Sequence, residues 1–215
     1  MTQETTAGAL VDRLAAAAAG GGRTIVAVAG PPGAGKSAFA AWLARTVAMR
    51  AGAEAVAVLG MDGFHYDDRV LEAWGERPRK GAPHTFDVDG LAATLARLAA
   101  DDGRAVAVPV FDRAIEIARA GAAIIGPAAR LVIVEGNYLL LAAPPWPALA
   151  PHFDLTVMLG VDEAEVRRRL LQRWADLSPE ALALKMDGND MPNVRLVMTA
   201  SRPADLTLTP GPEVR

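Results

Sequence analysis

Short apolar runs alternate with longer amphipathic segments along most of the chain. The apolar runs are the predicted strands, and they cover residues 24–29, 55–59, 131–134, 154–159 and 205–208. Runs that are apolar at nearly every position are typical of strands buried on both faces of a parallel sheet. The predicted helices cover residues 5–19, 36–49, 91–100, 162–175 and 178–184. Because strands alternate with helices, the pattern predicts an α/β fold around a five-stranded, mainly parallel sheet.

Two segments depart from this alternation. Residues 105–111 form an extended run in which Pro109 indicates a sheet edge or a bulge, because proline cannot donate a hydrogen bond to a neighbouring strand. Residues 63–87 are rich in Gly, Pro, Arg and His and show little helical or strand periodicity. A long irregular segment inside a compact domain is usually functional. No repeat or linker divides the sequence, so residues 1–215 are predicted to form one domain.

The composition excludes several classes of protein. Hydrophobic residues make up 52% of the 215 residues, and the net charge of −3 argues against general affinity for nucleic acid or anionic membrane. The chain contains no cysteine, which excludes a disulfide framework and a thiolate metal site. Residues 1–6 carry no basic cluster, and no run is long and apolar enough to cross a bilayer. We therefore expect a cytoplasmic protein.

Residues 30–37, Gly-Pro-Pro-Gly-Ala-Gly-Lys-Ser, match the phosphate-binding motif G-x-x-x-x-G-K-S/T in full. The glycines allow backbone N–H groups to approach a phosphate closely, and the following helix directs its positive end at the same place. Lys36 is expected to contact the β- and γ-phosphates, and Ser37 to coordinate Mg²⁺. The alternative is a glycine-rich turn without a ligand, but the strand before the motif and the helix after it favour binding of ATP. The expected nucleotide-binding residues are Gly30, Pro31, Pro32, Gly33, Ala34, Gly35, Lys36, Ser37 and Ala38.

Two acids directly follow predicted strands. Asp62 comes after the strand at 55–59, and Glu135 after the strand at 131–134. Ligands of parallel α/β sheets lie beyond the carboxyl ends of the strands, so both acids are candidates for chemistry. Glu135 is expected to hold Mg²⁺ together with Ser37, and Asp62 to accept the proton of an attacking hydroxyl. The alternative interpretation is that each of the two acids caps a helix or lies in an exposed loop.

Three further motifs carry a resemblance to a known family. They are Met61–His65 (MDGFH), Arg79–Pro83 (RKGAP) leading to Thr85–Asp87, and Val134–Tyr138 (VEGNY). The N-K-x-D motif of GTPases and the L-S-G-G-Q motif of ABC ATPases are absent from the sequence. In this order the three motifs resemble the uridine kinase, pantothenate kinase and phosphoribulokinase group, above all its bacterial nucleoside kinase-like and fructose-transport-associated members. The resemblance covers residues 24–208.

The resemblance implies a P-loop three-layer sandwich and roles for individual residues. Asp62 matches the catalytic base and Glu135 the acid that supports Mg²⁺ and the acceptor. Asp87 matches an aspartate that contacts acceptor hydroxyls, and Arg113 falls where relatives place acceptor-binding residues. The patterns that surround the sugar and base in uridine kinases are not reproduced, and R-K-G-x-P matches pantothenate kinases only in part. The acceptor is therefore left open.

A helical lid is expected at residues 162–192. Arg169 and Arg173 share one face of the predicted helix, while Val166, Leu170 and Trp174 form its buried side. The resemblance implies that such a helix closes over the phosphates and that its arginines stabilise the transferring group. An ordinary solvated basic face is the alternative. Residues 189–193 and 201–205 have the composition of loops, and the resemblance implies that they form part of the adenine pocket.

The irregular segment offers further acceptor-binding candidates. His65 is expected to hydrogen-bond the acceptor, and His84 is an alternative. Arg77, Arg79 and Lys80 form a basic cluster that is either a surface patch or a site for a phosphate- or carboxylate-bearing acceptor. Both interpretations stay open.

These features together predict an ATP-dependent, Mg²⁺-dependent kinase that phosphorylates a hydroxyl of a small metabolite. A nucleoside or a fructose-like sugar is the first expectation for the acceptor, and a pantothenate-like acid the second. A nucleotide-binding regulator or slow ATPase without an acceptor is the competing hypothesis. We expect no nucleic-acid or membrane partner, and a homodimer is left open.

Overall fold

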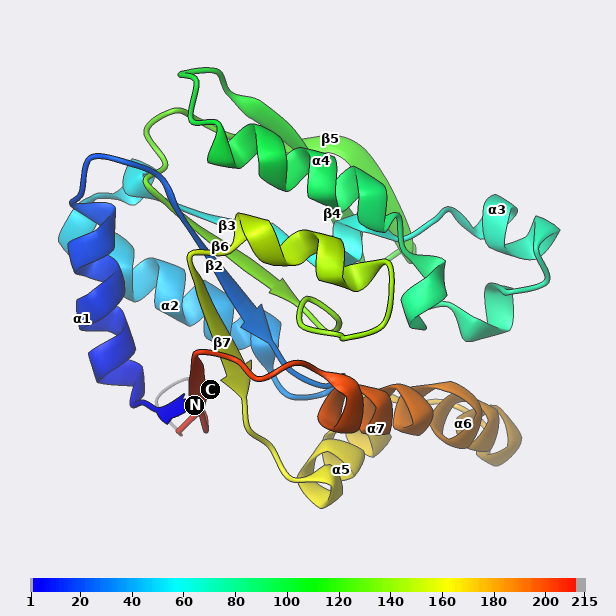
Figure 1. Ribbon diagram of the computed structural model, residues 1–215. Coiled ribbons are helices and arrows are strands. Elements are labelled where there is room, and N and C mark those ends of the chain that lie inside the picture. The colour runs from blue at the N-terminus through cyan, green and yellow to red at the C-terminus, as the bar shows by residue number, and fades with distance from the viewer. Residues whose placement is uncertain (1, 212–215) are drawn as a thin grey trace.

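The computed structural model describes residues 2–211 and centres on a six-stranded, fully parallel sheet (Figure 1). The strands are β1 (Gln3–Glu4), β2 (Thr24–Ala29), β3 (Val56–Gly60), β6 (Leu131–Gly136), β7 (Leu155–Leu159) and β8 (Leu206–Leu208). Their order in space is β1-β8-β7-β2-β6-β3. The sheet has six strands and not the predicted five, because β1, an edge strand of two exposed residues, pairs with β8. It escapes prediction because two polar residues produce no apolar run.

Helices cover both faces of this sheet. α1 (Ala7–Ala18) and α2 (Lys36–Ala51) pack on one face, while α4 (Val88–Ala99) and the 3₁₀ helix Trp146–His152 pack on the other (Figure 1). Alternate residues of β2 separate the two cores: Val26 and Val28 belong to the first, and Ile25 and Ala27 to the second. The expected three-layer α/β sandwich is confirmed.

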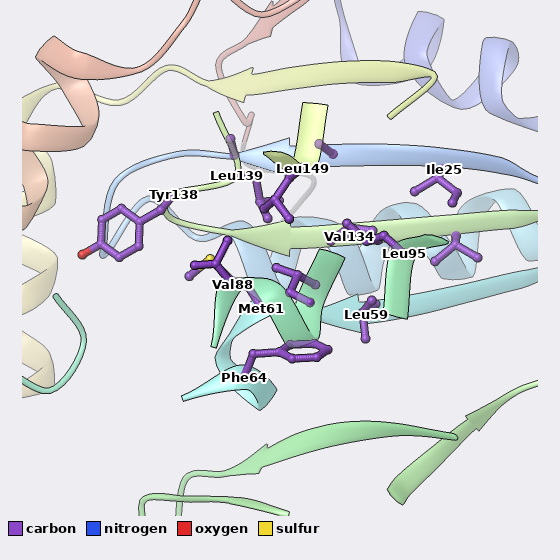
Figure 2. Close-up of a cluster of buried hydrophobic side chains, with 14 of the residues drawn as sticks. Ile25, Leu59, Met61, Phe64, Val88, Leu95, Val134, Tyr138, Leu139 and Leu149 are labelled. Carbon is purple, nitrogen blue, oxygen red and sulfur yellow. The ribbon is translucent and has the colours of Figure 1, made fainter. Parts of the chain in front are cut away.

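The second core extends to the carboxyl ends of the strands. Figure 2 shows Met61, Phe64 and Val88 packed around the end of β6, with Tyr138 projecting its hydroxyl away from the other labelled side chains. Gly136, the last residue of β6, is needed here because a Cβ would lie 2.5 Å from the Cβ of Met61. This close approach brings the 3₁₀ turn Met61–Phe64 against the end of β6.

The expected lid is a helical subassembly with its own apolar cluster. It consists of α5 (Glu163–Arg173), α6 (Pro179–Lys185), a π-helical turn (Met186–Asp190) and α7 (Met191–Ala200). The sequence predicts the first two helices but assigns residues 189–193 to a loop, which is wrong. Pro192 lies in the first turn of α7, which continues directly from the π-helical turn, so its missing N–H leaves the Gly188 carbonyl without that helical donor.

The segment between β3 and α4 is compact although it lacks sequence periodicity. It contains the short helix α3 (Asp68–Ala73) and the 3₁₀ turns Arg77–Arg79 and Pro83–Thr85. After α4, β4 (Val106–Asp112) and β5 (Ile117–Ile125) form a separate antiparallel hairpin. Its register shifts between Val108 and Val110, which confirms the bulge predicted at Pro109. β5 was not predicted because most of its residues are small or exposed.

No helix within residues 2–211 combines the length and the apolar character needed to cross a membrane.

Candidate active site

The phosphate-binding motif forms a tight loop between β2 and α2. Gly33 and Gly35 adopt φ values of +79° and +88°, which side chains rarely tolerate. A Cβ on Gly33 would also lie 3.1 Å from Cγ of Leu170, because α5 packs directly on the loop. α2 begins at Lys36, so the free N–H groups of its first turn lie at the end of the loop. The geometry is that of an anion-binding cradle.

Lys36 is buried within this cradle. Its Nζ donates a hydrogen bond to the carbonyl oxygen of Pro31 at 2.9 Å. Burial lowers the pKa of Lys36 to about 8, although the nearby Glu135 and Asp62 carboxylates raise it. A buried ammonium with a single carbonyl acceptor is poorly compensated, so an anionic ligand would stabilise it strongly.

Ser37 and Glu135 form a pair of hard oxygen donors beside Lys36. The Ser37 hydroxyl donates to Oε1 of Glu135 at 2.9 Å. Burial raises the pKa of Glu135, and the Lys36 charge and the Ser37 hydrogen bond oppose this effect. A hydroxyl and a carboxylate suit Mg²⁺, which takes few protein ligands and completes its shell with water and phosphate oxygens. Among residues 2–211 no larger group of His, Asp and Glu side chains forms a metal cage.

Asp62 lies in the 3₁₀ turn that follows β3, where two neighbours hold it. Arg113, from the turn of the β4–β5 hairpin, donates to Oδ2 of Asp62 at 2.6 Å. Nδ1 of His65 lies 2.8 Å from the Asp62 carbonyl oxygen. Burial lowers the pKa of His65, so the ring is neutral, and a carbonyl partner requires the hydrogen on Nδ1. Nε2 of His65 is therefore a hydrogen-bond acceptor.

Aromatic rings and an ion-pair cluster complete this side of the site. The His65 ring lies between Phe86 and Phe111, at centroid distances of 4.0 and 4.9 Å. Lys80 Nζ and Arg77 Nε both donate to the carboxylate of Asp68, at 2.5 and 2.8 Å. Burial raises the pKa of Asp68, but the two hydrogen bonds outweigh it and the net shift is downward.

A cavity of about 470 Å³ brings most of the predicted residues together. The charged and polar candidates that line it are Lys36, Ser37, Asp62, His65, Lys80, Arg113, Glu135 and Arg173. Pro32, Gly33, Gly35 and Ala38 of the nucleotide-binding set also line it, whereas Gly30, Pro31 and Ala34 support the loop from behind. A second cavity of about 280 Å³ lies under the hairpin and shares Asp62, Arg113 and Glu135 with the first.

Besides Gly30, Pro31 and Ala34, three predicted residues do not line the cavity. Arg79 donates to the Gly188 carbonyl oxygen at 2.6 Å, and Asp87 caps α4 by accepting from the Gly90 N–H at 2.8 Å. Arg169 pairs with Glu165 and donates to the Ala34 carbonyl oxygen at 3.2 Å, so it fastens α5 to the phosphate loop. Direct contact of these three with a ligand stays a prediction.

The lining also contains Asn137, Trp174, Asn189, Asp190 and Asn193. Asn189, Asp190 and Asn193 belong to the segment 189–193, which the resemblance places in the adenine pocket; which ligand they contact stays a prediction. Sequence reasoning missed Asn137 and Trp174 as lining residues. Asn137 could have been found from its position two residues after Glu135 in the V-E-G-N-Y motif, whereas Trp174 was expected only on the buried side of its helix.

A complete phosphate loop at the end of a central parallel strand, acids at the ends of two neighbouring strands and a helical lid define a P-loop kinase. No model of a known protein family matches the chain. The crystal structure of a "putative fructose transport system kinase" from Silicibacter sp. TM1040 shares 42% identity and a TM-score of 0.85, over 94% of this chain and 98% of that one. "Putative uridine kinase C227.14" of Schizosaccharomyces pombe is 33% identical over 81% of this chain and 78% of its own length.

A pantothenate kinase of Parvibaculum lavamentivorans is 33% identical over 71% of this chain, but the match covers 48% of that enzyme. The chain belongs to the P-loop kinases of the uridine kinase and pantothenate kinase group. The family expected from the three sequence motifs is confirmed.

Proposed function

We propose that the protein transfers the γ-phosphoryl group of ATP to a hydroxyl group of a small polar metabolite, most simply a sugar or a nucleoside. The observation that carries the proposal is that Lys36, the Ser37–Glu135 pair and Asp62 all face one cavity. Charge-stabilising and proton-accepting groups are thus within reach of one bound pair of substrates. Membership of a kinase family supports this assignment.

The phosphate loop would hold the nucleotide. The N–H groups of the first turn of α2 and the Lys36 ammonium supply positive charge to the phosphates. Ser37 and Glu135 would hold Mg²⁺, which when bound neutralises charge on the phosphate oxygens. Arg173 lines the cavity from the end of α5 and would add positive charge at the transferring group.

Asp62 would accept the proton of the attacking hydroxyl. A carboxylate can do so only when it points at the acceptor, and the hydrogen bond from Arg113 fixes its orientation. Arg113 is therefore a positioning residue in this proposal. The lid helices would close over the cavity and exclude water, which would otherwise compete as the acceptor.

The acceptor is proposed to be a nucleoside or a fructose-like sugar, with a pantothenate-like acid as the second candidate. In this proposal Arg79, Asp87 and Arg169 act by holding the walls of the site. The cytoplasmic location and the homodimer stay predictions.

The test is ATP consumption by the purified protein with Mg²⁺, in the presence of nucleosides, free sugars, pantothenate and related hydroxyl compounds. We expect one class of acceptor to raise turnover far above the rate with ATP alone. Asp62→Asn should lower the stimulated rate by about 10²–10⁴-fold, because a general base contributes on that order. Asp89→Asn removes the same charge from an exposed position on α4 and should leave the rate unchanged.

A flat response to every acceptor, together with tight ATP binding, would support the regulator or slow ATPase. An undiminished stimulated rate in Asp62→Asn would show that Asp62 is not the base.

A further inference from the structure

A cluster of three buried polar side chains lines the cavity from the lid. Asn189, Asp190 and Asn193, here called the lid cluster, are 2%, 8% and 3% exposed. They line the same cavity as Lys36 and Asp62. Buried polar groups persist only where hydrogen bonds compensate their loss of water, so each needs a partner in the protein or in a ligand.

The backbone of the lid fixes this cluster against the loop at 77–81. Pro192 has no N–H to offer the Gly188 carbonyl four residues earlier, and Arg79 donates to that carbonyl instead. Nδ2 of Asn189 donates to the Lys80 carbonyl oxygen at 3.0 Å. The lid cluster therefore lies beside the basic loop.

The lid cluster retains unused capacity to accept hydrogen bonds. Nδ2 of Asn193 donates to Asn189 Oδ1 at 3.2 Å, and within residues 2–211 no protein donor engages Asn193 Oδ1. Oδ2 of Asp190 accepts from Trp174 Nε1 at 2.8 Å, while Oδ1 lies 3.9 Å from Lys185 Nζ, beyond hydrogen-bonding distance. Asn193 Oδ1 and Asp190 Oδ1 can therefore each accept a hydrogen bond from a ligand, and a hydroxyl group can donate one.

The cations nearest the basic loop on this side of the cavity are already engaged by carboxylates within the protein. Lys80 and Arg77 share the carboxylate of Asp68, and Arg113 is paired with Asp62. An anionic acceptor would have to break one of these pairs to gain a cation. These contacts help to hold the loop at 77–81, which favours a supporting role of the basic cluster over direct binding of an anionic acceptor.

We propose that the acceptor is an uncharged, hydroxyl-rich molecule, and that hydroxyls remote from the reacting one donate to Asp190 and Asn193. This inference rests on the proposed kinase function and narrows its acceptor. Free sugars and nucleosides satisfy it, whereas phosphate esters and carboxylic acids do not. Asn189 acts as a positioning residue, since both polar atoms of its amide are engaged within the protein.

Matched acceptor pairs test the charge requirement. Turnover of ATP is measured with free sugars and nucleosides and with their monophosphates, and with pantothenate as the carboxylate. We expect stimulation by uncharged members only. Stronger stimulation by an anionic member would overturn the inference but keep the kinase, whereas stimulation by none would overturn the proposed function itself.

Two variants test the hydrogen bonds. Asp190→Asn, which keeps the shape of the side chain, and Asn193→Ala should each raise KM for the stimulating acceptor about tenfold, the loss expected for one buried hydrogen bond. KM for ATP and the rate without acceptor should stay within twofold. Thr199→Ala, an exposed change further along α7, is the matched control. Thermal unfolding of each variant checks the fold, and an unchanged acceptor KM in the folded Asp190→Asn protein would refute the contact.

Discussion

The phosphate loop and the proposed acceptor side of the cavity are built in different ways. The loop is eight consecutive residues, 30–37, whose conformation follows from its own glycines and the helix that continues it. The acceptor side, here called the acceptor wall, draws on distant segments and comprises Asp62, His65, Lys80, Arg113, Asn189, Asp190 and Asn193. Local sequence suffices for the first, and only the complete fold assembles the second.

The two regions also differ in the bonds that hold them. Backbone conformation and the helix end maintain the loop. Side-chain donors to backbone carbonyls join the parts of the acceptor wall: Asn189 binds the Lys80 carbonyl, and the Tyr138 hydroxyl binds the Gly81 carbonyl at 2.6 Å. A change in the loop should therefore affect ATP binding and chemistry but not stability, while a change in the wall should affect stability and acceptor binding together.

The largest effect is expected from Lys36→Met. Turnover should fall by about 10²–10³-fold, as for the loss of one charge-stabilising group. Unfolding temperature should not fall, because the substitution removes a buried charge whose one hydrogen-bond acceptor within residues 2–211 is the backbone carbonyl oxygen of Pro31. Steady-state kinetics and thermal unfolding measure the two effects.

The matched control applies the same substitution to the wall. Lys80→Met leaves Asp68 with one cation fewer and frees the Glu116 carbonyl, so we expect a lower unfolding temperature and a raised KM for the acceptor. Equal stability losses in both variants would remove the distinction between the two regions.

A pH dependence of ATP affinity is the next largest effect. The pKa of Lys36 is lowered to about 8 in the free protein, and a bound triphosphate raises it. Binding therefore takes up a proton, and affinity falls as pH rises above about 8, by about tenfold per unit until the pKa of the complex is reached. Calorimetry in buffers of different ionisation enthalpy measures this uptake.

Lys36→Arg provides the control for that experiment, since a guanidinium stays protonated throughout the range. Its ATP affinity should vary little between about pH 7 and about pH 9.5, a range that spans the lowered pKa of Lys36, about 8. The same decline in the arginine variant would assign the pH dependence to another group.

The smallest effect is expected from Tyr138→Phe in the wall. The ring is fully buried against Phe86 and Trp146, so the substitution keeps the packing and removes only the bond to the Gly81 carbonyl. We expect a loss of about 1 kcal/mol in unfolding free energy and a severalfold rise in acceptor KM. KM for ATP should not change. A rise in KM for ATP without a rise in KM for the acceptor would contradict the division between loop and wall.

The sequence predicts those parts of the molecule whose signal is local. The doubly buried strands, the phosphate loop and the positions of Asp62 and Glu135 at strand ends all follow from contiguous residues. β5 and α7 were missed because their burial depends on partners elsewhere: β5 is mostly exposed, and α7 starts with a loop-like N-D-M-P-N stretch. Asp87 and Arg79 were placed in the site by motif, but their side chains are used for a helix cap and a carbonyl contact.

The pairing of the first strand with the last bears on chain connectivity. β1 lies beside β8 at the sheet edge, so segments far apart in sequence are neighbours in space (Figure 1). Because the two strands are parallel, a linker from the end of β8 to the start of β1 would have to run back along the length of a three-residue strand, about 10 Å. Residues Gly20–Gly22 between α1 and β2 are exposed, and a circularly permuted chain opened there would begin at β2 and run straight into the phosphate loop. Every strand pair of the sheet would be kept, because strand pairing depends on which strands are neighbours in space and not on their order along the chain.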